Sequence, residues 1–335
     1  MNWGIIGLGN MAKKFGLAIK ELRESTLIGA SSKSFFRLIK FGLRNNIKLK
    51  YLFNDYEKIL SCKEIQNIYI GSLNNSHFKI IDSCIKAGKN ILCEKPFVVS
   101  DEEAEIIKDK LKNSNIFFLE AIAYRSHPQT QNIKKLINDN QIGKVVRIKS
   151  RFGFDAGRPK INGRHFSKEL GGGSILDLGC YPLTMSNFIA NLNTANNETL
   201  PTIEEVSGKI LQTGVDLNAK AKLIYNGSIK AEIFVSLEKN FDNSTEIFGT
   251  NGVMRIRSPW LPEKDSFIEI VKNGESKKYY TNCKFSIFAN QINVFDSLAK
   301  GSNLKDNHAM SIDNSVNYMR ILSKWKRQLL KNESK

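Results

Sequence analysis

Short apolar runs alternate with amphipathic stretches along the chain up to about residue 125. The first run, residues 2–7, is almost wholly apolar and ends in glycine, which predicts a buried strand. Beyond it, apolar residues from Met11 to Leu22 recur at helical spacing. Further strands are expected at residues 27–31, 68–72, 90–93 and 116–119, and further helices at residues 78–87 and from residue 100 onward. This alternation predicts an α/β fold with a doubly wound parallel sheet.

From Lys144 onward the pattern changes to many short strands with few helices between them. Apolar residues occupy alternate positions from Ile229 to Val235, which is typical of a half-buried strand. The Asn-Gly pairs at residues 226–227 and 251–252 are typical of tight hairpin turns. Strands are expected at residues 144–154, 203–212, 218–225, 228–237, 244–249, 252–257, 267–272 and 277–281. This half is therefore predicted to be α+β with an open, mostly antiparallel sheet.

Helices are sparse in this second half. One is expected after Asp177, two late ones at residues 285–299 and 307–330, and a polar loop at residues 191–199. A chain of 335 residues favours two domains over one. We expect one domain over residues 1–123 and another over residues 124–335, with the last helix able to pack back on the first domain.

The composition is that of an ordinary soluble globular protein, with 41% apolar and 25% charged residues. No apolar run approaches the length of a membrane span, and the amino terminus lacks a signal-peptide pattern. The five cysteines show neither metal-type nor redox-type spacing, so we expect reduced thiols in a cytoplasmic protein. The four histidines are not paired as metal ligands usually are, and no metal site is predicted.

The formal charge of +17 raises the question of nucleic-acid binding. The lysines, however, are spread along the whole chain, with no long basic run and no interleaved aromatic residues. We therefore expect no nucleic-acid and no membrane partner, and only a modest attraction for anionic substrates or cofactors.

A glycine turn joins the first predicted strand to the first predicted helix. Gly7, Gly9 and Ala12 match the fingerprint of a Rossmann dinucleotide-binding fold, with alanine in the third position. Gly7 allows the tight turn, Gly9 lets a pyrophosphate approach the backbone, and the helix that opens at Asn10 and Met11 offers free amides. A dinucleotide cofactor is therefore predicted, and a plain strand–helix turn is the alternative.

The residues after the second strand bear on which dinucleotide binds. An acidic residue there usually holds the ribose hydroxyls of NAD, whereas a basic residue suits the 2′-phosphate of NADP. No acid occurs between Ser25 and Arg44, and the strand is followed by Ser32 and Lys33. These two side chains are expected to hold a phosphate by hydrogen bond and charge, so NADP is favoured and NAD is the alternative.

Two further strands deliver polar residues to the same edge of the predicted sheet. Asn74 and His77 follow the strand at residues 68–72, and Glu94 and Lys95 follow the one at residues 90–93. Ligands bind at the carboxyl edge of such sheets. Lys95 is thus expected to donate a hydrogen bond to a substrate oxygen, and a simple surface lysine is the alternative reading.

The stretch from Gly171 to Tyr181 places an acid and a phenol four residues apart, just after three glycines. On a helix, Asp177 and Tyr181 would share one face, and the glycines would let a backbone or a flat ligand approach the helix start. A carboxylate and a proton donor on one face suit acid–base work on a hydroxyl or carbonyl. An exposed aspartate and a half-buried tyrosine with no such role are the alternative.

Taken together, these motifs resemble the glucose–fructose oxidoreductase/inositol dehydrogenase (Gfo/Idh/MocA) family along nearly the whole chain. The glycine fingerprint, the Asn74 to His77 turn, Glu94-Lys95-Pro96 and the glycine triplet with Asp177 and Tyr181 carry the resemblance. Many members have histidine at the position of Tyr181. In having tyrosine there, the chain is similar to the branch of dimeric dihydrodiol dehydrogenases and NADP-linked xylose dehydrogenases. Leu73 departs from the proline that members often have there.

The resemblance implies a dinucleotide-binding domain at residues 1–123 and a substrate-binding and oligomerisation domain at residues 124–335. It also implies hydride transfer between a nicotinamide and a secondary alcohol or ketone of a sugar, inositol or trans-diol. Tyr181 would exchange the hydroxyl proton, helped by Lys95, which would also contact the nicotinamide ribose. Asp177 would orient the substrate or balance the charge of Lys95. Arg125 and Arg164 are weaker candidates for substrate or cofactor contacts.

Two other functions are compatible with this resemblance. The family includes glycosidase-like enzymes that keep the dinucleotide bound, and sensors that bind it without catalysis. Sensors are free to lose the lysine or the tyrosine, and this chain keeps Lys95 and Tyr181. The expected partners are a small polyol or sugar and a second copy of the chain, in a homodimer or homotetramer formed through the second sheet.

Overall fold

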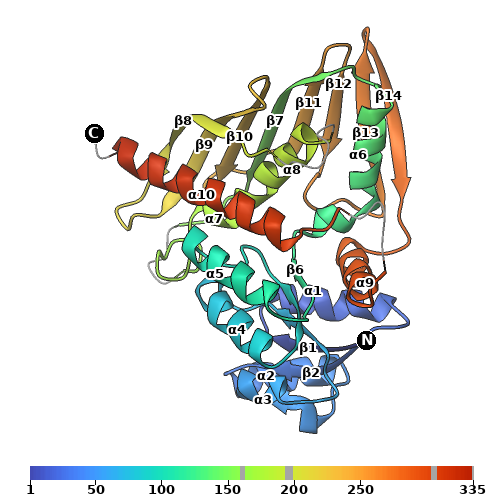
Figure 1. The fold of residues 1–335 in the computed structure, drawn as a ribbon, viewed down its shortest axis with the longest axis vertical. Coiled ribbons are helices and arrows are strands. Elements are labelled where there is room, and N and C mark those ends of the chain that lie inside the picture. The colour runs from blue at the N-terminus through green and yellow to red at the C-terminus, as the bar shows by residue number, and fades with distance from the viewer. Residues whose placement is uncertain (159–162, 193–198, 303–307, 334–335) are drawn as a thin grey trace. The chain divides into compact units, whose positions relative to one another are not determined.

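The computed structural model describes residues 1–335 except 159–162, 193–198, 303–307 and 334–335 (Figure 1). The chain forms two compact units. Unit 1 consists of Met1–Ser126 and Lys284–Val316, and unit 2 of His127–Cys283 and Asn317–Lys335. We describe each unit by itself.

Unit 1 contains a six-stranded sheet in the order β3-β2-β1-β4-β5-β6, with every neighbouring pair parallel. The strands are β1 (Asn2–Ile6), β2 (Thr26–Ser31), β3 (Leu52–Phe53), β4 (Asn67–Ile70), β5 (Asn90–Cys93) and β6 (Phe118–Glu120). The strand order reverses between β1 and β4, and the carboxyl ends of the strands at such a reversal are where open α/β sheets bind ligands. The predicted doubly wound parallel sheet is thus confirmed.

The helices of unit 1 are α1 (Asn10–Ala18), α2 (Phe35–Arg44), α3 (Tyr56–Leu60), α4 (Asn74–Lys86), α5 (Asp101–Lys112) and α9 (Ile287–Ala299), with short 3-10 turns η1 (Ile19–Glu21), η2 (Leu49–Tyr51) and η3 (Ala123–Ser126). Strand β3 and helices α2 and α3 were not predicted from the sequence. Ser100 accepts a hydrogen bond from the Glu103 amide, and the Glu103 carboxylate accepts one from the Val99 amide. These reciprocal contacts form a capping-box arrangement at the start of α5.

Helix α9 comes from the far end of the sequence yet belongs to unit 1. Its Phe295 ring lies 4.8 Å from the ring of Trp3, which in turn lies 5.3 Å from Phe15 of α1. The buried carboxylate of Asp296 accepts hydrogen bonds from Asn67 Nδ2 (3.1 Å), Trp3 Nε1 (3.4 Å) and the Ser25 hydroxyl. Apolar packing and this polar cluster together fix α9 against β1, β4 and the residue before β2.

Unit 2 contains an eight-stranded sheet in the order β14-β13-β12-β11-β7-β10-β9-β8. The strands are β7 (Val145–Gly153), β8 (Thr202–Ile210), β9 (Asp216–Tyr225), β10 (Ile229–Ser236), β11 (Ser244–Gly249), β12 (Val253–Arg257), β13 (Asp265–Lys272) and β14 (Glu275–Asn282). Among the described strands of this sheet only β7 and β10 pair in parallel, so the expected mostly antiparallel sheet is confirmed. Asn226 and Gly227 turn β9 into β10 with φ of 51° and 67°, as a tight primed turn requires.

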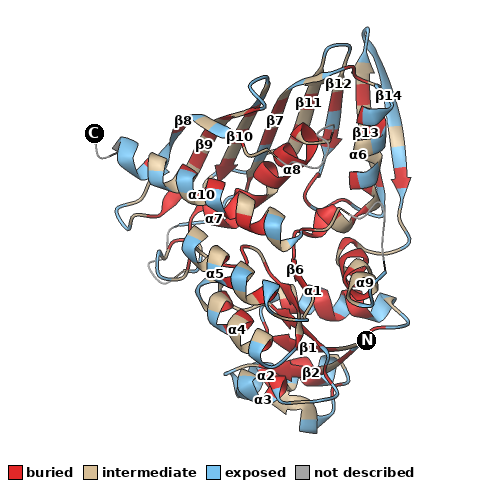
Figure 2. Cartoon of the chain, viewed as in Figure 1, coloured by how far each residue is buried: buried red, intermediate tan, exposed pale blue. Residues whose placement is uncertain are grey.

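The helices of unit 2 are α6 (Pro128–Asn138), α7 (Ser174–Leu178), α8 (Cys180–Ala190) and the part of α10 (Ile312–Glu333) that follows Val316. Helix α8 lies on β7 and β10, and apart from Tyr181 its residues are buried (Figures 1 and 2). The helix expected after Asp177 is confirmed as α8, and a further short helix, α7, which carries Asp177 itself, begins at Ser174 and is separated from α8 by Gly179. Most of the predicted loop at residues 191–199, and the expected start of the last helix at Asn307, lie outside the described residues.

Candidate active site

The two glycines of the turn after β1, Gly7 and Gly9, have different structural roles. Gly7 has a φ of 90°, and a Cβ there would lie 2.6 Å from the Ser72 nitrogen of the segment after β4. Its own amide donates to the Ser31 carbonyl at 3.1 Å. Gly7 is therefore required by the packing of the ends of β1, β2 and β4 on one another.

Gly9 instead faces open space. It is the residue before α1, the helix has no side-chain cap, and the nearest described atom to a Cβ at Gly9 would be the Gly71 carbonyl oxygen, 3.9 Å away. Asn10, which is exposed, and Met11, which is half-buried, open the helix. An uncapped helix start beside an unfilled space suits a pyrophosphate, so these residues fit a dinucleotide cofactor.

The turn after β2 carries exposed basic side chains. The hydroxyl of Ser32 accepts from the Ser34 amide at 3.2 Å, and Ser34 caps α2 by accepting from the Arg37 amide at 3.5 Å. Lys33 and Arg37 are both exposed on this turn and the first turn of α2. Arg37 was not selected from the sequence, although its place four residues after Lys33 was visible there.

His77 lies in α4 and is fully buried. Its Nδ1 lies 2.9 Å from the carbonyl oxygen of Pro96, and its Nε2 lies 3.3 Å from that of Ser72. The ring thus braces the segment after β4 against the segment after β5. Asn74, which opens α4, is half-buried and lacks a side-chain cap before it, since Leu73 precedes the helix.

Glu94 and Lys95 follow directly on β5. The Glu94 carboxylate is 8% exposed and accepts a hydrogen bond from the Tyr69 hydroxyl. The Tyr69 ring stacks on Phe15 of α1 at 4.2 Å, so Glu94 is tied to the core beneath the glycine turn. Lys95 is half-buried and precedes Pro96 through a cis peptide bond. Lys95 therefore stands at the carboxyl end of β5, as expected.

Arg125 is 8% exposed and lies within unit 1. Its Nε donates to the His308 carbonyl at 2.6 Å. Close by, Met310 forms an isolated bridge with Glu120 at the end of β6. Arg125 thus helps hold the segment before α10 on unit 1.

Asp177, in unit 2, is 5% exposed and has cationic and potentially cationic neighbours. Arg164 Nη2 donates to its Oδ1 at 3.0 Å, and His165 Nδ1 lies 3.1 Å from its Oδ2. Arg164 was expected to contact a substrate, and in the structure it holds Asp177. His165 was not selected from the sequence, because nothing in its local pattern links it to Asp177.

Tyr181 is half-buried at the start of α8 among aromatic rings. Its ring meets Phe152 of β7 edge-to-face at 5.2 Å and lies 5.9 Å from Trp260, which is 2% exposed. Such an apolar surround strengthens any charge interaction of the phenol, because local water is replaced by rings of low polarity.

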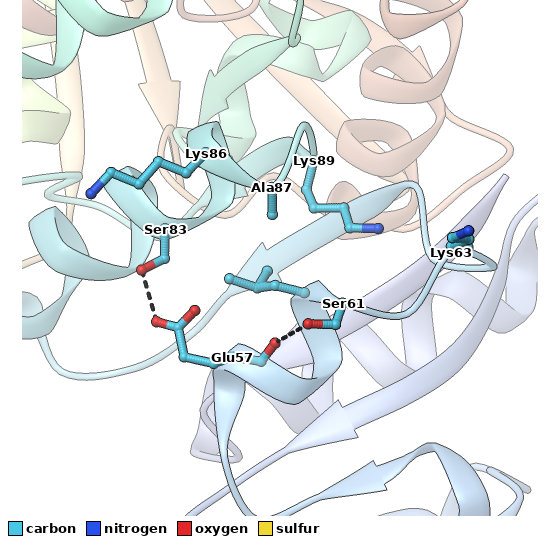
Figure 3. A pocket seen from close by; sticks show the side chains of 8 residues that line it. Glu57, Ser61, Lys63, Ser83, Lys86, Ala87 and Lys89 are labelled. Carbon is cyan, nitrogen blue, oxygen red and sulfur yellow. Dashed lines mark hydrogen bonds between the residues drawn. The ribbon is translucent and has the colours of Figure 1, made fainter.

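Unit 1 also has a hollow that lies away from these residues (Figure 3). It measures about 440 Å³ and is lined by Glu57, Leu60, Ser61, Lys63, Ser83, Lys86, Ala87 and Lys89. Ser83 donates to Glu57 at 2.9 Å, and Lys89 Nζ donates to the carbonyls of Cys62 and Ile65 (2.8 and 2.7 Å). The hollow lies by the start of β5, whereas Lys95 lies just beyond the carboxyl end of that strand.

Within the described ranges, no group of three or more His, Cys, Asp or Glu side chains is arranged to hold a metal ion. Over the same part of the chain, no helix is both long and apolar enough to cross a bilayer.

Comparison with known protein families identifies the family to which these two units belong. Residues 1–121 match the model of an oxidoreductase family with an NAD-binding Rossmann fold, and residues 130–255 match the Gfo/Idh/MocA C-terminal domain. The chain belongs to the Gfo/Idh/MocA family of oxidoreductases. The resemblance seen in the sequence is thus confirmed, as are the oxidoreductase class and the nicotinamide dinucleotide cofactor.

Curated relatives in this family include the trans-1,2-dihydrobenzene-1,2-diol dehydrogenases. The Xenopus tropicalis protein is 28% identical over 280 residues, which cover 83% of this chain and 80% of that protein. The Mus musculus protein is 27% identical over 281 residues, with the same coverage.

Solved structures with the same fold share far less sequence. A 3-ketoreductase from Actinomadura kijaniata, in complex with NADP and TDP-benzene, superposes with a TM-score of 0.85 at 17% identity, covering 98% of this chain and 97% of that one. An aldose-aldose oxidoreductase from Caulobacter crescentus complexed with glycerol gives 0.86 at 18% identity, covering 98% of each chain.

Proposed function

We propose that this oxidoreductase uses NADP to oxidise or reduce a secondary alcohol or ketone of a trans-diol or a sugar. The observation that carries the proposal is the acid–phenol pair of unit 2. Asp177 is buried and held by Arg164, and Tyr181 follows it by four residues inside an aromatic surround. The names of the diol dehydrogenases similar to this chain support the substrate class.

A bound nicotinamide supplies the hydride acceptor or donor, and the protein supplies proton transfer. We assign this proton transfer, to or from the reacting oxygen of the substrate, to the Tyr181 hydroxyl. A phenol with a pKa near its usual value of about 10 is a weak base at neutral pH, so it needs a cation to favour the phenolate. We assign that role to the ammonium group of Lys95, which also donates a hydrogen bond to the reacting oxygen. Asp177 orients the substrate hydroxyl, and the half-exposed Arg164 contacts the substrate from the same side.

The preference for NADP over NAD rests on the turn after β2. Lys33 and Arg37 are exposed there, Ser32 is half-buried beside them, and no acid lies between Ser25 and Arg44. Two cations and a hydroxyl suit a 2′-phosphate, whereas the ribose hydroxyls of NAD would find no carboxylate.

The remaining site residues are proposed to shape the cofactor site. Gly7, Gly9, Asn10 and Met11 form the pyrophosphate turn. Asn74, His77 and Glu94 maintain the carboxyl edge from which Lys95 projects, with His77 acting through the two carbonyls it braces. Arg125 acts through the His308 carbonyl that it holds.

We also propose that the chain works in the cytoplasm as a homodimer or homotetramer. All five cysteines are unbridged in the structure, and three of them are buried, which suits a reducing compartment. One face of the unit 2 sheet carries the half-buried aromatic rings of Phe234, Phe248 and Phe267, which suits contact with a second copy.

The experiment that tests this function is a panel of trans-diols, sugars and inositols offered with NADP⁺ and with NAD⁺. We expect reduced cofactor to accumulate with at least one diol or sugar, faster with NADP⁺. Product formation without net cofactor reduction would instead mark a retained-cofactor enzyme of the glycosidase-like kind. Cofactor binding without turnover of any compound would mark a sensor.

A further inference from the structure

A buried carboxylate stands behind the helix that carries Asp177. Asp216, the first residue of β9, is 2% exposed. Its Oδ2 accepts hydrogen bonds from the Ile175 amide at 2.6 Å and from the Ser174 hydroxyl at 2.8 Å. These are the first two residues of α7, and the residue before them, Gly173, has no side chain with which to cap the helix. A strand distant in sequence therefore provides the cap that a helix usually takes from its own N-terminal residue.

The glycine triplet makes room for this arrangement. Gly173 has a φ of 115°, and a Cβ there would overlap Asp216 Oδ1. A Cβ on Gly172 would lie 2.7 and 2.8 Å from the carbonyl oxygens of His165 and Arg164. The sequence suggested that these glycines admit either a backbone or a flat ligand. In the structure they admit the chain's own carboxylate and carbonyl groups.

The same glycines also connect to the groups around Asp177. The Gly173 amide donates to the His165 carbonyl at 3.0 Å, and the Asp177 amide donates to the Gly173 carbonyl at 3.0 Å. The side chains of Arg164 and His165 both reach the Asp177 carboxylate. Gly173 thus links the residues that hold Asp177 to the helix that presents it, and Asp216 lies directly against Gly173.

Keeping Asp216 in this place is energetically costly. Burial raises the pKa of the Asp216 carboxyl, while the Ile175 and Ser174 hydrogen bonds and the charge of Lys326 act to lower it. Burial lowers the pKa of Lys326, which lies on α10. Among the described residues, Asp216 Oδ1 has no hydrogen-bond partner. A buried carboxylate that is only partly compensated lowers the stability of the fold. Its presence here therefore indicates a role other than stability.

We propose that Asp216 is a positioning residue for the proton-transfer pair. Its carboxylate fixes the start of α7, and through α7 it fixes Asp177 and, beyond Gly179, Tyr181. This inference rests on the proposed function of those two residues. It extends that function because Asp216, which is not itself a reacting group, determines where Asp177 and Tyr181 lie.

The first test compares Asp216→Ala with Asp216→Asn. The alanine variant loses the cap, and we expect its kcat to fall roughly 10- to 100-fold, as small misplacements of reacting groups do. The asparagine variant keeps an oxygen that accepts from Ile175, so we expect it to retain most of the activity. The affinity for NADPH, measured by fluorescence titration, should stay at the wild-type value in both variants because Asp216 belongs to unit 2.

Asp242→Ala is the matched control, since it removes an exposed carboxylate from the same unit. A kcat for Asp216→Ala equal to that of Asp242→Ala would overturn the proposal. So would an equal loss in the alanine and asparagine variants, because the accepting oxygen would then not matter. If Asp216→Ala does not fold, Ser174→Ala takes its place. It removes one of the two donors, so a smaller loss of kcat supports the proposal and an unchanged kcat contradicts it.

A second test does not depend on turnover, so it separates failure of this inference from failure of the proposed function. The chain has three tryptophans, and Trp260 lies beside the Tyr181 ring. With 5-fluorotryptophan incorporated, we expect Asp216→Ala to shift the Trp260 fluorine resonance and to leave that of Trp3, in unit 1, in place. Trp260→Phe assigns the signal. An unchanged Trp260 resonance would contradict the positioning role of Asp216, whether or not a substrate has been found.

Discussion

Tyr181 and Lys95 are the residues on which the proposed chemistry depends most directly. We expect Tyr181→Phe and Lys95→Ala each to lower turnover about 10²-fold or more, the usual size for a general acid–base group. NADPH affinity should remain close to wild type, because neither side chain is assigned to the phosphates. Steady-state kinetics and fluorescence titration check the two halves of this prediction. Near-normal turnover in both variants would rule the assignment out.

Lys33 decides the prediction about cofactor preference. Since its ammonium group is exposed on the turn after β2, we expect Lys33→Ala to weaken NADP much more than NAD. Dissociation constants for the two cofactors measure this directly. Lys63→Ala is the matched control, because this lysine lines the hollow by the start of β5. Equal losses for both cofactors would remove the phosphate role from Lys33.

His127 links stability to pH. Burial lowers its pKa from 6.5 to about 4, so the folded chain keeps the ring neutral where the unfolded chain already binds a proton. Its contribution to stability is therefore complete above pH 6.5 and is lost as the pH falls toward 4, by at most about 3 kcal/mol. Burial raises the pKa of Asp216 and Asp296, which acts in the opposite direction.

The variant His127→Asn isolates this effect. Asparagine is able to cap α6 as His127 does when it accepts from the Gln129 amide, but it does not titrate. Urea unfolding at several pH values should show a shallower loss of stability for the variant between pH 6.5 and 4. Parallel curves for variant and wild type would contradict the prediction.

At the scale of elements, the periodicity of the sequence was a good guide. Strands β7 to β14 were all predicted, the alternation of apolar residues is clear in β10, and the Asn226-Gly227 turn was recognisable from two residues. The start of α7 was missed. A helix was considered after the three glycines, but its first residue could not be located because no local side chain caps it: the cap is Asp216, 41 residues beyond Ile175.

Helix α9 provides a prediction at this scale. Asp296→Ala would leave Asn67 Nδ2, Trp3 Nε1 and the Ser25 hydroxyl buried without their acceptor. We expect a loss of about 3 kcal/mol in the free energy of unfolding, since each buried unsatisfied group costs about 1–3 kcal/mol. Chemical denaturation measures it. Ser297→Ala, on the exposed side of α9, is the control, and equal stabilities of the two variants would refute the role of the cluster.

At the scale of the whole molecule, one face of the unit 2 sheet is the surface that we propose for self-association. Phe234, Phe248 and Phe267 are half-buried on three of its strands. Around them, Arg147 pairs with Glu232 at 2.5 Å, and Lys149 lies over the Phe248 ring at 5.8 Å. The Arg147–Glu232 pair carries no net charge, so it adds no repulsion next to the apolar ring of Phe248.

We expect light scattering to report a dimer or tetramer for the wild type. Phe248→Glu should shift it toward monomer, because a carboxylate would replace an apolar contact in the interface. Phe35→Glu is the matched control, since that ring is 72% exposed on α2 of unit 1. A wild type that is monomeric, or a control that dissociates equally, would refute the interface.

The sequence alone determined the α/β class, the glycine turn, the mostly antiparallel second sheet and the candidate pair of Asp177 and Tyr181. These depend on periodicity and spacing among neighbouring residues, which a chain carries without being folded. Only the tertiary structure decided that Asp216 caps α7, that α9 joins unit 1 and that His77 braces two carbonyls. Their partners stand up to 293 residues apart, and a buried polar group reveals its partner only when folding brings the two together.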